Sequence, residues 1–253
     1  STGVQVTQNS GSPGSTINVR IRGVGTIGNS NPLYIVDGVP VDGMDFLNPS
    51  DIASMNVLKD AASTAIYGAR GANGVVLITT KEGKRNETGK VSYDAYYGNQ
   101  SPWKKVNLLN AREYAILSNE AHVAAGKAPL PEFANPDAVG EGTDWLAAIF
   151  QDAGMTNHQL SISGGGSKST YLVSGSYYGQ DGIIGGNKSN FNRYTARINA
   201  TNEVKDWLNV GTRLNFTNFK KRALPENSEF SSPLIRALNM DPITPIRKYD
   251  GSF

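Results

Sequence analysis

The sequence contains no cysteine, which excludes disulfide bonds, thiolate metal ligands and a cysteine nucleophile. It also lacks any run of about 18 apolar residues, so it encodes no transmembrane helix. This second absence leaves a membrane β-barrel open, because barrel strands alternate instead of running apolar throughout. The formal net charge of +2 is too small to indicate a nucleic-acid partner.

Motifs for catalysis and for metal or cofactor binding are also missing. The two histidines, His122 and His158, have no further ligand at a zinc-binding spacing, and no G-x-S-x-G motif occurs. Residues 23–28 match G-x-G-x-x-G after a strand, but Pro32 and its polar neighbours oppose the helix that a dinucleotide site needs. We therefore predict that the protein is not an enzyme and holds no metal or cofactor.

What the sequence does have is glycine and alternating strands. Its 28 glycines exceed the usual share of about 7% and favour many turns. Between residues 156 and 219, four segments alternate apolar and polar residues, as half-buried β-strands do. The last segment carries four apolar side chains on one face: Leu208, Val210, Leu214 and Phe216. Alternation fits a membrane barrel and a soluble β-sandwich equally well, so both remain open.

The first 84 residues predict a separate, small mixed α/β domain. We expect strands at 16–22, 33–36 and 75–80, and helices at 52–58 and 61–67. Asp37-Gly38 is a strong turn signal after the second strand.

Residues 85–253 have a different character, which begins after a polar linker at 83–89. A first long strand starts near Val91, and short and long connections then alternate between the strands. Helices are expected at 110–125 and 144–150, whereas the proline-containing final thirty residues read as a loop.

Long motifs in both parts resemble one family. Residues 12–23 and 32–40 resemble the plug domain of TonB-dependent outer-membrane transporters. Residues 48–75, with Val57-Leu58-Lys59-Asp60-Ala61 and Arg70-Gly71-Ala72-Asn73-Gly74, are similar to the plug segment of the SusC/RagA branch. Segments 110–114, 143–145 and 191–197 are similar to the first barrel segments of that branch.

This resemblance implies a membrane β-barrel, all-β and of about 22 strands when complete, around a small mixed α/β plug. This chain would supply most of the plug (1–84) and the first barrel strands and outer loops (85–253). The family implies TonB-dependent active import of glycans or oligopeptides across the bacterial outer membrane, without covalent chemistry. The implied partners are a SusD-like surface lipoprotein, outer-membrane lipid and TonB, which would bind a segment absent from this chain.

Two sets of site residues follow from this hypothesis. An arginine on the lipid face near mid-bilayer would cost about 2–4 kcal/mol, so we expect the polar face of the strands to line the lumen. The lumen-facing set is Arg193, Arg197, Asn199, Asn209, Arg213 and Asn215. Plug loops are the expected substrate contacts, because loops carry recognition. That set is Gly23, Gly25, Asn29, Asn31, Asp37, Asp42 and Asp45, of which the aspartates also suit simple turns.

Two further alternatives remain at this point. Arg20, Arg22 and Arg70 could pair with acidic residues on a surrounding wall, or they could be solvated charges. The whole chain could instead be a soluble extracellular carbohydrate-binding or adhesin β-domain. In that case the apolar strand face would contact protein and not lipid.

Overall fold

The computed structural model of the chain describes all residues except 1–2, 9, 24–27, 249 and 253. It divides into two compact units. The first unit contains residues 1–98, 154–181 and 190–222, and the second contains 99–153, 182–189 and 223–253. No helix within the described ranges is both long and apolar enough to cross a membrane.

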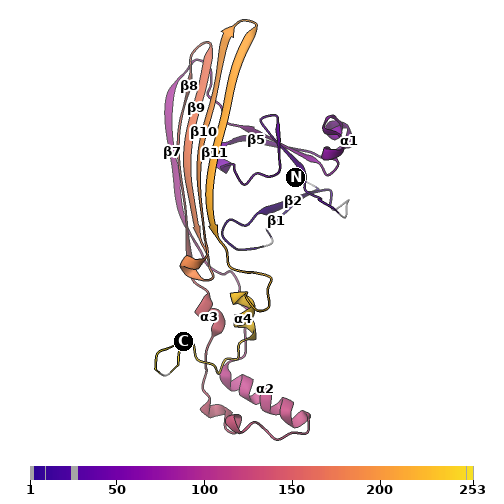
Figure 1. Cartoon of the computed structure of the whole chain (residues 1–253), viewed down its shortest axis with the longest axis vertical. Helices are drawn as coiled ribbons and strands as arrows, with labels where there is room; N and C mark the ends of the chain where they lie inside the picture. Colours follow the sequence, from indigo (N-terminus) through magenta and orange to yellow (C-terminus); the bar gives the residue numbers. More distant parts are fainter. Residues whose placement is uncertain (1–2, 9, 24–27, 249, 253) are drawn as a thin grey trace. The chain divides into compact units, whose positions relative to one another are not determined.

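Five long antiparallel strands form one sheet of the first unit, called the long sheet here (Figure 1). The strands, in the sheet order β7 to β11, are β7 (Glu87–Gln100), β8 (Ala153–Gly165), β9 (Ser169–Asp181), β10 (Asn190–Lys205) and β11 (Leu208–Arg222). The predicted alternation is confirmed. Leu214 pairs with Ile198, and Ile198 with Val173, so apolar side chains of neighbouring strands share one face. The first strand begins at Glu87, inside the segment predicted as a linker.

Residues 3–84 form the N-terminal module, which contains two smaller sheets. A hairpin pairs β1 (Val4–Gln8) with β2 (Ile17–Ile21). The other sheet has the order β4-β3-β6-β5. Its strands are β3 (Leu33–Val36), β4 (Val39–Val41), β5 (Ile52–Leu58) and β6 (Val75–Thr80). Strands β3 and β6 are parallel, and Asp37-Gly38 makes the predicted turn between β3 and β4 with φ values of 49° and 87°.

The helix predicted at residues 52–58 is wrong, because these residues form strand β5. The Asn48 side chain caps a single 3₁₀ turn, η1 (Pro49–Asp51), and the chain then extends. Met55 pairs with Ile78 and Val57 with Val76. The edge of β6 therefore provides hydrogen-bond partners for an extended 52–58 segment, whereas a helix of this length is only marginally stable by itself. The next predicted helix is confirmed as α1 (Ala61–Thr64) and η2 (Ala65–Gly71), with a kink at Gly68.

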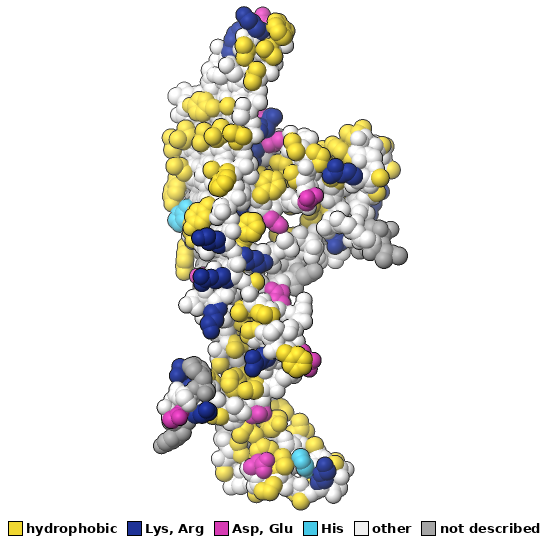
Figure 2. All heavy atoms as spheres, viewed as in Figure 1, with side chains coloured by type: hydrophobic (Ala, Val, Ile, Leu, Met, Phe, Trp, Pro, Cys, Tyr) yellow, Lys and Arg dark blue, Asp and Glu magenta, His cyan; other side chains and the backbone are white. Residues whose placement is uncertain are grey.

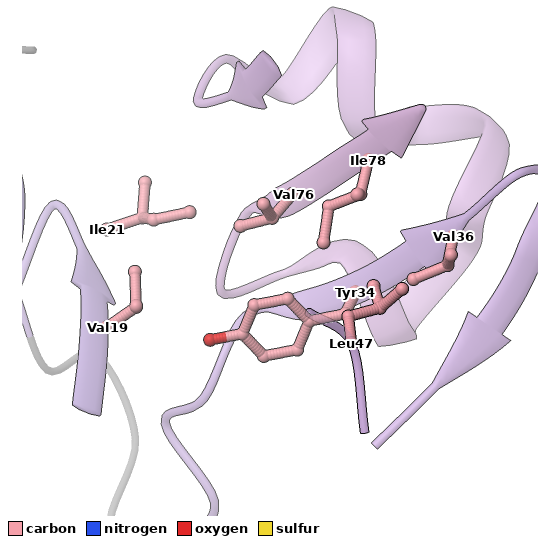
Figure 3. Packing of buried hydrophobic residues seen from close by; sticks show 7 residues of the cluster. All are labelled: Val19, Ile21, Tyr34, Val36, Leu47, Val76 and Ile78. Carbon is pink, nitrogen blue, oxygen red and sulfur yellow. The ribbon is translucent and has the colours of Figure 1, made fainter. Parts of the chain in front are cut away.

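The hairpin and the four-stranded sheet share one apolar core (Figure 3). In that view Val19 and Ile21 of β2 point towards Tyr34, Val76 and Ile78 of the sheet. Gly74 allows the close approach, because a Cβ atom there would lie 2.7 Å from a side-chain carbon of Ile21. The core therefore joins β2 to β3 and β6 by side-chain packing, not by strand pairing.

The second unit is mostly helical and loop structure. Its helices are α2 (Ala111–Ala124), η3 (Pro131–Phe133), η4 (Pro136–Ala138), α3 (Trp145–Ile149), η5 (Gly186–Lys188) and α4 (Pro233–Asn239). The helices predicted at 110–125 and 144–150 are confirmed, and Asn110 with Glu113 forms a capping box. Helix α4 lies where only loop was predicted. Ser232 caps it and Pro233 occupies its first turn, a position that proline tolerates.

Candidate functional site between the N-terminal module and the long sheet

The N-terminal module lies beside one face of the long sheet (Figure 1). A buried ion pair joins the two. Arg197 Nη2 of β10 lies 2.8 Å from Asp37 Oδ2, and the two side chains are only 4% and 8% exposed. Thr80, at the end of β6, donates its backbone N–H to Asp37 Oδ1 at 2.8 Å. Its hydroxyl donates to Asp37 Oδ2 and accepts from Arg197 Nη2. One carboxylate therefore connects β3, β6 and β10.

The local fold explains how Asp37 reaches this position. Parallel pairing of Val36 with Ile78 places the end of β3 beside the end of β6, and Asp37 N–H donates to Ile78 O. Asp37 has a positive φ of 49°, a conformation that aspartate tolerates better than most residues. The turn therefore aims the carboxylate at Thr80 and at the neighbouring strand of the long sheet.

Polar contacts continue along the segment that leaves the module. Asn199 Nδ2 donates to Lys81 O at 2.8 Å, and Arg213 Nη2 lies 2.5 Å from Glu82 Oε1. Asn199 and Arg213 are register partners on β10 and β11, so the contacts follow a row across the sheet. At Gly83 a Cβ atom would lie 2.2 Å from the backbone oxygen of Tyr171. Only glycine allows the chain to pass the sheet so closely.

A second buried carboxylate, Asp51 of η1, contacts strands β8 and β9. Asp51 Oδ1 accepts hydrogen bonds from Gln159 Nε2 at 2.8 Å and from Ser174 Oγ at 3.0 Å. Burial raises the pKa of Asp51 above its ordinary value, while the hydrogen bond from Ser174 and the charge of Arg197 act in the opposite direction.

Further polar atoms are buried without a protein partner among the described residues: Asn48 Nδ2, Gln159 Oε1, Arg193 Nε, Arg197 Nε, Arg197 Nη1 and Asn199 Oδ1. Buried polar groups of this kind are commonly satisfied by ordered water.

The structure brings four residues of the predicted lumen set onto the N-terminal module. Arg197, Asn199 and Arg213 make the contacts described above, and Arg193 Nη1 donates to Asp45 O at 2.8 Å. Of the other two, Asn215 donates to Thr217 Oγ1 at 3.3 Å and Asn209 is exposed. That these six residues line a lumen remains a prediction.

The predicted substrate-facing residues do not form one cluster. The Asp37 carboxylate is occupied by Arg197 and Thr80. The other described members are exposed: Gly23, Asn29, Asn31, Asp42 and Asp45. Asn31 Oδ1 accepts a hydrogen bond from Arg20. Gly25, with most of the 23–28 motif, lies outside the described residues. Substrate contact by the exposed members remains a prediction.

The sequence patterns do not single out Asp51, Thr80 or Glu82, although each lies at or near the end of a predicted element. They allow the opposite polarity for pairing, with arginines of the module meeting acids of a surrounding wall. The ion pairs between the described parts of the module and the long sheet include Asp37–Arg197 and Glu82–Arg213, with the acid on the module. The sequence feature that indicates this polarity is the presence of arginines on the polar faces of β10 and β11.

Comparison with known proteins places this arrangement in a family. The model of the TonB-dependent receptor plug domain matches residues 1–75. The TonB-dependent receptor SusC of Bacteroides thetaiotaomicron is 36% identical over 255 residues, covering 96% of this chain and 24% of SusC. The TonB-dependent receptor P26 of Formosa agariphila is 38% identical over 222 residues, covering 85% of this chain and 22% of P26.

A solved structure of the RagAB peptide importer in its closed-closed state superposes with a TM-score of 0.84 and 30% identity. The match covers 99% of this chain and 31% of that one. This chain belongs to the SusC/RagA type of TonB-dependent receptors. It spans about a quarter of the length of the curated relatives that it matches. Its fold is a plug with part of a barrel wall, and its location is the bacterial outer membrane.

Proposed function

We propose that the complete receptor imports glycans or oligopeptides across the outer membrane, using energy delivered through TonB. In this proposal the long sheet is the start of a closed barrel of about 22 strands. The N-terminal module fills that barrel, with the plug ending near residue 84. A SusD-like lipoprotein covers the outer face and captures the substrate. The receptor performs no covalent chemistry.

The observation that carries the proposal is the contrast between the two faces of the long sheet. The face towards the module bears charges and amides, including the buried Arg197 and Asn199. The opposite face bears exposed apolar residues, including Leu214 at 58% and Phe216 at 65% exposure. Figure 2 shows hydrophobic side chains gathered over this region. Hydrocarbon is the natural cover for such a face, because large exposed apolar surfaces are rare in soluble proteins.

The experiment uses the full-length receptor, expressed with its neighbouring lipoprotein in cells with and without TonB. Uptake of labelled oligosaccharides and of labelled oligopeptides is measured in parallel, together with fractionation of the membranes. We expect the receptor in the outer-membrane fraction and TonB-dependent uptake of one of the two substrate classes. A receptor that stays soluble without detergent and binds carbohydrate would instead support the soluble β-domain.

A further inference from the structure

The tip of the β1–β2 hairpin contacts the long sheet through Gly14. Gly14 N–H donates to Gln180 Oε1 of β9 at 3.2 Å, and Lys221 Nζ of β11 donates to Gly14 O at 3.0 Å. The preceding residue, Pro13, is fully buried. The ring of Phe191, on β10 between these strands, lies against Gly14. Three adjacent strands of the long sheet therefore contact one turn, Ser12–Ser15.

The turn requires glycine for two reasons. Gly14 has a positive φ of 61°, which residues with a side chain rarely adopt. A Cβ atom at this position would also lie 2.3 Å from a ring carbon of Phe191, far closer than carbon atoms normally approach. Any other residue would push the turn away from the long sheet.

The turn is also tied to strand β1. Gln8, the last residue of β1, donates its side-chain amide to Ser15 Oγ at 2.7 Å. Ser15 in turn donates its hydroxyl to Ser10 O and its backbone N–H to Ser12 O. A pull on the amino-terminal end of β1 would therefore be transmitted along the strand to the turn, and from there to Gln180 and Lys221.

The rest of the module is fastened differently. The β4-β3-β6-β5 sheet is complete without the hairpin and is attached to the long sheet through the buried Asp37–Arg197 pair. The hairpin joins that sheet by packing of Val19 and Ile21 (Figure 3). Its hydrogen bond with Lys221 is exposed and that with Gln180 is part-buried. Such hydrogen bonds separate more readily than a buried charge pair, because loss of that pair leaves each charge without its partner.

We propose that the Ser12–Ser15 turn is a latch for the hairpin, held by Gln180, Lys221 and Phe191. It is the contact that bears the load when the amino-terminal side of the module is pulled. Its release frees β1 and β2, while the Asp37–Arg197 pair keeps the four-stranded sheet on the long sheet. This proposal rests on the proposed function, because TonB would supply the pull.

The test follows the hairpin and the sheet separately in the full-length receptor. This chain has no cysteine, so after replacement of any cysteine elsewhere in the receptor two single reporters can be introduced: Val19→Cys in β2 and Val75→Cys in β6, which are 9% and 0% exposed. Val75 lies beside Gly71 and outside the core that Val19 and Ile21 cover, so its burial does not depend on the hairpin. The rate of maleimide labelling is measured during uptake, in cells with and without TonB. The latch is weakened from the long sheet by Gln180→Ala or by Lys221→Met.

We expect labelling of the Val19→Cys reporter to depend on TonB and to rise about fivefold in each latch variant, the effect of one lost hydrogen bond. Labelling of the Val75→Cys reporter should not change. Equal acceleration of both reporters would show that the module moves as one body and would overturn the latch. An unchanged rate of Val19→Cys labelling in both latch variants would also overturn the latch.

A matched pair of glycine variants gives a second test. Gly14→Ala should raise labelling of the Val19→Cys reporter, whereas Gly11→Ala in the same loop should not, because its added Cβ meets nothing within 4 Å. Should Gly14→Ala fail to assemble, the two variants in the long sheet still decide the question. Absence of TonB-dependent uptake in the unmodified receptor would refute the proposed function, whereas normal uptake with unresponsive reporters would refute only the latch.

Discussion

The interior of the N-terminal module and its interface with the long sheet are both buried, but they are built from different chemistry. Val76 and Ile78 in the interior are each 2% exposed and contact other aliphatic residues. At the interface, Arg197, Asn199 and Asp51 are each 4% exposed and are held by hydrogen bonds and charge. Burial alone therefore does not tell which of the two regions serves folding and which serves attachment.

The difference teaches that the folding of the four-stranded sheet and its attachment to the long sheet depend on different interactions. Strand pairing and apolar packing hold its four strands together. A polar interface can exchange its contacts for water when the parts separate, at a cost set by a few identified groups. Thermal or denaturant stability of the full-length receptor in detergent measures the contribution of each region.

The largest effect is expected for Arg197→Met, which leaves Asp37 buried without its cation. Removing one partner of a buried pair costs about 3–5 kcal/mol. The double variant Asp37→Asn with Arg197→Met removes both charges and should recover most of that loss. Equal instability of the single and double variants would show that the ion pair is not the main attachment of the module to the long sheet.

A smaller effect is expected for Ile78→Ala in the interior, about 2–5 kcal/mol from lost burial and the cavity left behind. Ile78→Ala and Arg197→Met should also differ in the part of the structure that they loosen. Cavity formation should loosen the four-stranded sheet itself, so that proteolysis within β3 and β6 accelerates. Arg197→Met should leave these strands protected and should instead release the module from the long sheet.

The dependence on pH gives a third way to separate the two regions. Burial raises the pKa of Asp51, so the folded receptor binds a proton that the unfolded chain releases in the window above the ordinary aspartate pKa. Stability contributed by this group is therefore complete at acid pH and is lost as pH rises through the raised pKa. Asp51→Asn keeps an oxygen acceptor for Gln159 and Ser174 but does not titrate.

We therefore expect the stability of Asp51→Asn relative to the unmodified receptor to increase from pH 4 to pH 7. The measurement compares the two unfolding curves at each pH in the same detergent. A relative stability that falls over this range would mean that the ionised carboxylate is favoured at the interface. Ile78→Ala, which changes no titratable group, is the matched control.

Much of the fold could be predicted from local patterns. Period-two alternation identifies β8 to β11 because one side of each strand is polar and the other apolar. The prediction of a helix at 52–58 is wrong because β6 supplies a pairing edge, a tertiary fact that no local pattern contains. Helix α4 is not predicted, because proline is as typical of a loop as of the first turn of a helix, where Pro233 lies.

The candidate site was predictable only in part. The alternation groups the arginines and asparagines of β10 on one face, and their assignment to a lumen, away from lipid, stays a prediction. Their partners were not, since Asp37 and Arg197 are 160 residues apart in the sequence. Asp51 gave no signal at all, because a lone aspartate after proline and serine equally suits a helix start.

The smallest effect is expected at the rim of the interface, where Glu82 and Arg213 are 40% and 49% exposed. Glu82→Gln should cost no more than about 1 kcal/mol, because water competes for both groups and salt screens their attraction. Unfolding is measured at low and high salt, and the difference from the unmodified receptor should shrink as salt increases. Under the same salt series the loss caused by Arg197→Met should stay nearly constant, since that pair is buried. A salt-independent effect of several kcal/mol for Glu82→Gln would instead show that the Glu82–Arg213 pair contributes as much to the attachment as a buried pair does.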